Sequence, residues 1–164
     1  MIQETQDLFT TLERLTGQIV DIISGAPLGF LDWRPGPETN SAAAIVTHTL
    51  GASRHWLVAI VAGGQSDRNR DAEFQAEAAQ IGAVERRAQQ WLADARQVLD
   101  SLSVEQLDQR SQRVRATTFA SAAEREAMTA RGAILHVIEH LGTHIGHLEL
   151  TVQLYAQLEP KAGS

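Results

Sequence analysis

All six histidines of the 164-residue chain fall in two segments, and four of them recur at helical spacing. His136, His140, His144 and His147 form one stripe on a helix of about 3.6 residues per turn. The stripe coincides with an apolar face, so we expect some of these imidazoles to point into the protein interior. Two histidines four residues apart can direct ring nitrogens at one metal ion about 2 Å from each. The stripe therefore indicates metal binding.

The remaining two histidines, His48 and His55, lie in a segment rich in alanine, valine, leucine and isoleucine. They are separated by two helical turns, roughly 10 Å along the axis, so one ion cannot easily bind both. His48 has the more interior setting, between Ala44 and Ala52, which favours it as a ligand from a second helix. His55 is left as a candidate for the mouth of a pocket.

Two other interpretations of the same histidines stay open. Inward-facing imidazoles can form a polar, water-bridged network in a core without any metal. Residues 136–140 also fit H-x-x-E-H, the inverted zinc-peptidase motif, in which His136 and His140 bind zinc and Glu139 acts as general base. That family needs a distant downstream acidic ligand, and only 24 residues follow His140, which disfavours a peptidase.

The composition excludes several other chemistries. The chain has no cysteine, which removes disulfides, thiolate metal sites and a cysteine nucleophile. Its only lysine is Lys161, near the end of the chain, so a lysine Schiff base or a phosphate-loop lysine is not expected. Because the net charge is -6, we expect no nucleic-acid partner.

Apolar residues at intervals of three and four predict two helices, over residues 4–24 and from 71 or 81 to 102. Residues 42–62 are apolar nearly all round, which predicts a buried helix, and the histidine stripe lies on a fourth helix from 121 or 129 to 157. Prolines mark a connector after the helix at 4–24, and Gly63-Gly64 ends the helix at 42–62. Ser103 caps a short helical turn, and residues 113–118 could form a strand or hairpin arm. We therefore expect one all-α domain over residues 1–164, a four-helix bundle.

Neither a membrane nor a secreted location is expected. The longest apolar stretch, Trp56 to Ala62, is far shorter than the roughly 18 to 20 residues that cross a bilayer. The first fourteen residues are acidic and polar, unlike the basic start of a secretory signal. We expect a cytoplasmic protein.

Three sequence features occur together along the chain: Trp33-Arg34-Pro35, Asn40-Ser41 opening a helix that contains His48, and H-V-I-E-H-L-G-T-H-I-G-H at residues 136–147. With this combination the chain resembles the DinB/YfiT-like superfamily of metal-dependent enzymes. The resemblance covers nearly the whole chain. It implies a four-helix bundle in up-down-down-up order that holds one divalent ion.

Carried over by position, the resemblance implies His48, His140 and His144 as the metal ligands. His136, His147 and His55 are candidates for residues that line a pocket or contact the metal ligands without binding the metal. Some relatives carry glutamate at the position of His140, and histidine there is equally able to bind metal. Three imidazoles do not distinguish zinc, nickel, iron or manganese.

The resemblance also implies a range of functions. Relatives include transferases that use bacillithiol, mycothiol or glutathione, and a mycothiol-dependent maleylpyruvate isomerase. The expected function is thus a metal-dependent S-transferase acting on small electrophiles with a low-molecular-weight thiol. A metal-dependent hydrolase and a non-catalytic, metal-stabilised stress or interaction bundle are the alternatives. Relatives commonly dimerise, so a homodimer with a small-molecule substrate is expected.

Overall fold

The structure is a computed structural model that describes residues 1–27, 29–77, 81–110 and 128–158. Its long helical segments are α1 (Gln3–Ser24), α2 (Ala42–Arg54) with the π-helix η1 (His55–Val61), α4 (Ile81–Ser101) and α7 (Ala130–Ala156). Two short helices connect them, α3 (Arg70–Phe74) and α5 (Val104–Leu107). No strand occurs among the described residues. The predicted all-α class is confirmed.

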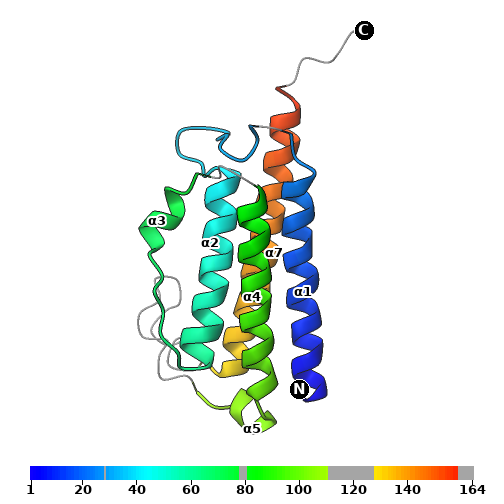
Figure 1. Ribbon diagram of the computed structural model, residues 1–164, viewed down its shortest axis with the longest axis vertical. Coiled ribbons are helices and arrows are strands. Elements are labelled where there is room, and N and C mark those ends of the chain that lie inside the picture. The colour runs from blue at the N-terminus through cyan, green and yellow to red at the C-terminus, as the bar shows by residue number, and fades with distance from the viewer. Residues whose placement is uncertain (28, 78–80, 111–127, 159–164) are drawn as a thin grey trace.

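The four long segments run up, down, down and up, as the resemblance implied (Figure 1). α1 rises from the N-terminus, α2 and α4 both descend, and α7 rises toward the C-terminus. Because α2 and α4 run the same way, the chain that follows η1 must return to the top of the bundle. α3 lies on this return path and packs beside α2.

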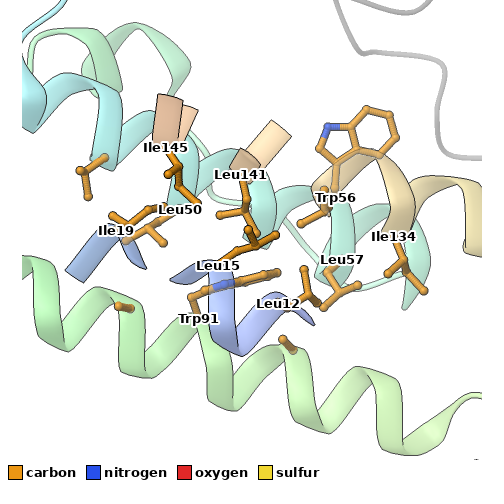
Figure 2. Close-up of a cluster of buried hydrophobic side chains, with 14 of the residues drawn as sticks. Leu12, Leu15, Ile19, Leu50, Trp56, Leu57, Trp91, Ile134, Leu141 and Ile145 are labelled. Carbon is orange, nitrogen blue, oxygen red and sulfur yellow. The ribbon is translucent and has the colours of Figure 1, made fainter. Parts of the chain in front are cut away.

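Apolar faces of all four segments meet in one core. α1 contacts α4 and α7, and α2 contacts the same two helices from the opposite side. Figure 2 shows Leu12 and Ile19 of α1 facing Trp91 of α4 and Leu141 of α7. All four side chains are buried, which confirms the stripes predicted for α1 and α4. Burial of such apolar surface is the main stabilising contribution in a bundle of this kind.

The second helix has the predicted ends but an unpredicted last part. The side chain of Ser41 accepts a hydrogen bond from the backbone of Ala44, so Ser41 is the N-cap. Residues 55–61 then widen into π-helix, in which hydrogen bonds span five residues instead of four; such turns are often found near functional sites. Gly63 ends the segment at a φ of 75°, a conformation that glycine adopts without strain.

The third predicted helix is two helices in the structure, which corrects one of the two predicted starts. Asn69 caps the short α3 by accepting a hydrogen bond from the backbone of Ala72. α3 ends at Phe74, and α4 begins separately at Ile81. The start near residue 71 was wrong because that residue belongs to the returning connector. The start at residue 81 is confirmed.

The remaining predicted boundaries agree where the structure describes them. Ser103 and Gln106 form a reciprocal capping box at α5. Thr129 caps α7, so the later of the two predicted starts is confirmed. The possible strand at 113–118 and the earlier start at residue 121 fall outside the described residues. None of the described helices combines the length and apolar character needed to cross a bilayer.

Candidate metal centre

α2 and α7 bring three histidines to one point. His140 and His144 lie one turn apart on α7, and their Nε2 atoms are 3.2 Å apart. His48, from the middle of α2, is 6 % exposed and places its Nε2 3.3 Å from Nε2 of His140. One possible ligand atom from each residue lies within 4.8 Å of the other two. The structure thus gathers the three residues that the resemblance implied as ligands.

The spacing in this three-histidine cluster agrees with that around a small divalent ion. A tetrahedral ion with nitrogen ligands at about 2.0–2.1 Å separates two of those nitrogens by about 3.3 Å. Two of the three Nε2–Nε2 separations in the cluster, those from His140 to His48 and to His144, are 3.3 and 3.2 Å. The cluster is therefore compatible with a metal site.

A hydrogen-bonded network without metal fits these contacts less well. Nε2 of His140 is close to Nε2 of both His48 and His144, yet a neutral ring nitrogen offers either one N–H or one lone pair. It can complete only one of the two hydrogen bonds. Nδ1 of His140 is also buried, without a hydrogen-bond partner among the described residues. Ligation would satisfy all three Nε2 atoms and leave Nδ1 of His140 as the unpaired atom of the cluster.

Two of the three rings are neutral at physiological pH. Burial, together with the neighbouring His144 and His48, lowers the pKa of His140 to about 3. Burial, His48 and His147 lower the pKa of His144 to about 4. Both rings therefore present uncharged nitrogens whose lone pairs a cation can use.

A carboxylate and a guanidinium hold His48 on the side away from the cluster. Nδ1 of His48 lies 3.0 Å from Oε2 of Glu73, whose side chain is also buried. Arg68 donates to Oε1 of Glu73 from Nε and to Oε2 from Nη2, at 2.7 and 2.8 Å. Burial raises the pKa of Glu73, but hydrogen bonds from Arg68 and His48 outweigh that effect and lower it. The ring of Phe74 stacks on His48, with centroids 4.7 Å apart.

Sequence reasoning missed Arg68 and Glu73. Asn69 followed by acidic residues is a usable sign of a helix start. Nothing in the spacing, however, connects Glu73 with His48, since the two are 25 residues apart and meet only through the returning connector.

His136 and His147 do not join the cluster. His147 is exposed, and its Nδ1 lies 3.3 Å from Nδ1 of His144, on the far side of that ring from the cluster. His136 packs against Trp56, with ring centroids 4.6 Å apart. Among the described residues, the ligand group is therefore limited to three histidines. His140 and His144 both keep partial exposure, so the cluster is not sealed from solvent.

The peptidase motif does not assemble. It requires His136 and His140 to bind one ion, whereas the structure pairs His140 with His144. Glu139, the residue that would act as base, is exposed and lies 3.7 Å from Nδ1 of His136. The H-x-x-E-H spacing is therefore incidental to the arrangement of the cluster.

A cavity of about 220 Å³ lies between α2, α3 and α4. Leu50 and Trp91 form apolar parts of its wall, and Glu73 borders it from the side of the cluster. His55, predicted at a pocket mouth, does not line this cavity. Its Nδ1 instead lies 2.7 Å from Oγ of Ser66, and burial lowers its pKa.

Comparisons with known proteins agree with the fold. A crystal structure described as the conserved protein of a locus from Enterococcus faecalis has a TM-score of 0.75 to this chain. The match has 13 % sequence identity and covers 96 % of this chain and 99 % of that one. No curated protein is similar enough in sequence to be matched. Residues 11–148 match the DinB superfamily, and because that match covers most of the chain, the protein belongs to this superfamily.

Proposed function

We propose that the protein is a divalent-metal-dependent enzyme that joins a low-molecular-weight thiol to a small electrophilic substrate. The observation that carries this proposal is the convergence of three imidazoles without a fourth protein ligand among the described residues. Structural zinc sites are usually closed by four protein ligands, whereas catalytic sites keep a position for water or substrate. Three ligands with partial exposure support a catalytic site.

The chain's own residues prepare this site in two ways. The lowered pKa values of His140 and His144 keep both rings uncharged at neutral pH. Glu73 holds His48 by its Nδ1, so that Nε2 faces the other two rings. A divalent ion bound there would lower the pKa of a bound thiol and so supply a thiolate at neutral pH.

The sulfur has to come from a cofactor. The chain contains no cysteine, so it cannot provide a thiol of its own. In the proposed reaction the cofactor's thiol loses its proton to solvent or buffer. Its sulfur then forms a bond to the electrophilic carbon, and the leaving group departs with the electron pair of the broken bond. Bacillithiol, mycothiol and glutathione are the thiols to compare.

The test is conjugation of each thiol to monochlorobimane by metal-stripped protein reloaded with zinc, nickel, iron(II) or manganese. We expect one combination of thiol and metal to exceed the uncatalysed rate, and His144→Ala to remove the excess. His55→Ala is the matched control, because His55 lies outside the ligand group. If every rate equals the uncatalysed one while metal is bound, the protein is a non-catalytic bundle. Turnover of ester substrates without thiol would instead identify a hydrolase.

A further inference from the structure

The short helix α3 carries one buried side chain, and that side chain is a carboxylate. Glu73 is the buried residue of α3, which packs beside α2 (Figure 1). Burying a carboxylate is costly unless charged or polar partners compensate it. Both oxygens of Glu73 have such partners: Oε1 accepts from Arg68, and Oε2 lies against both Arg68 and His48.

α2 leaves space for this carboxylate at Gly51. A Cβ added to Gly51 would overlap Oε1 of Glu73 and lie 3.1 Å from its Cδ. Gly51 lies one turn after His48, so the space opens beside the ligand. Any larger residue at this position would push the carboxylate away from the imidazole.

We propose that Glu73, anchored by Arg68, is a positioning residue that fixes the Nδ1–H tautomer of His48 and so directs its Nε2 lone pair at the cluster. This inference rests on the proposed metal site. A guanidinium is always charged, and its two hydrogen bonds to Glu73 keep the carboxylate ionised. An ionised carboxylate can only accept hydrogen bonds, so Nδ1 of His48, 3.0 Å from Oε2 of Glu73, carries the hydrogen. Nη2 of Arg68 also lies 3.4 Å from this Nδ1, but its shorter contact, at 2.8 Å, is with Oε2 of Glu73. In a neutral ring the lone pair then lies on Nε2.

His48 is held differently from the other two rings of the cluster. Nδ1 of His144 meets only another imidazole, that of His147, and Nδ1 of His140 has no partner among the described residues. His48 therefore has the one carboxylate partner that the described part of the chain supplies to the cluster. Such partners of metal-bound histidines fix the ring and raise its basicity, and their loss typically lowers metal affinity about 10–100-fold.

The first measurement is zinc affinity, by competition with a chromophoric chelator. Glu73→Ala removes the carboxylate, and Gly51→Ala displaces it without removing any ionisable group. We expect each to raise the Kd for zinc about 10–100-fold. Glu77→Ala, an exposed carboxylate just beyond α3, and Gly17→Ala, where an added Cβ meets nothing within 4 Å, are the matched controls. Both controls should keep the wild-type Kd.

The second measurement separates positioning from packing. Long-range ¹H–¹⁵N spectra of the metal-free protein report which nitrogen of His48 carries hydrogen. We expect the Nδ1–H form in the wild type and a shift toward the Nε2–H form in Glu73→Ala and Gly51→Ala. An unchanged tautomer or an unchanged Kd in folded Gly51→Ala overturns the inference. If the wild type binds no zinc, the proposed function fails, while the tautomer measurement still decides whether Glu73 positions His48.

Discussion

Acidification is expected to destabilise the metal-free protein through His140 and His144. In an unfolded chain both rings have a pKa of about 6.5, whereas in the folded protein the values are about 3 and about 4. At pH values between the unfolded and the folded pKa, the unfolded state binds protons that the folded state does not. The free energy of unfolding therefore falls as the pH falls below about 6.5.

The size of this effect can be worked out at about pH 5.5. At one unit below the unfolded pKa, each histidine lowers the free energy of unfolding by about 1.4 kcal/mol, so the pair contributes about 3 kcal/mol. This energy depends little on the pKa values in the folded protein, because values of about 3 and about 4 both leave His140 and His144 neutral at this pH.

Urea unfolding in the presence of a chelator, at about pH 7.5 and 5.5, measures this effect. Between about pH 7.5 and 5.5, the free energy of unfolding of the wild type should fall by about 3 kcal/mol more than that of a double variant with His140→Gln and His144→Gln. The other titratable groups are common to both chains and cancel in the comparison. Equal losses in the wild type and the double variant would refute the assigned environment of these rings.

Three further substitutions test the packing of the bundle in the same urea assay at neutral pH. Leu141→Ala empties a fully buried position and should lower the free energy of unfolding by about 2–5 kcal/mol. Trp91→Phe removes the N–H that donates to the buried hydroxyl of Thr16 and should cost about 1–2 kcal/mol. Thr129→Ala removes the N-cap of α7, whose side chain accepts from Gly132, and should cost about 1 kcal/mol. Losses near zero would contradict these contacts.

The bundle could be predicted from the sequence because its signals are local. Buried residues such as Leu12 and Ile19 recur at helical spacing and share one face. Gly63 and the capping residues mark the helix ends through their own backbone preferences. The π-helix at residues 55–61, which contacts α7 and α4, was not predicted, because its apolar sequence does not distinguish it from an α-helix.

The candidate site could be predicted only in part. His140 and His144 lie one turn apart on one helix, so their convergence follows from helix geometry alone. His48 was predicted as a ligand from its apolar setting and from the family resemblance. Arg68 and Glu73 could not be found, because they reach His48 only after the chain returns past α2. Contacts made by an irregular connector depend on the tertiary fold and leave no periodic pattern in the sequence.

The most direct test of the three-histidine site is zinc content after equilibration with zinc and dialysis, measured by plasma mass spectrometry on protein without a histidine tag. The wild type should retain about one equivalent. His48→Ala, His140→Ala and His144→Ala should each retain much less, whereas His136→Ala and His147→Ala should retain as much as the wild type. A wild type without zinc, or full retention in the first three variants, would contradict a metal site at this cluster.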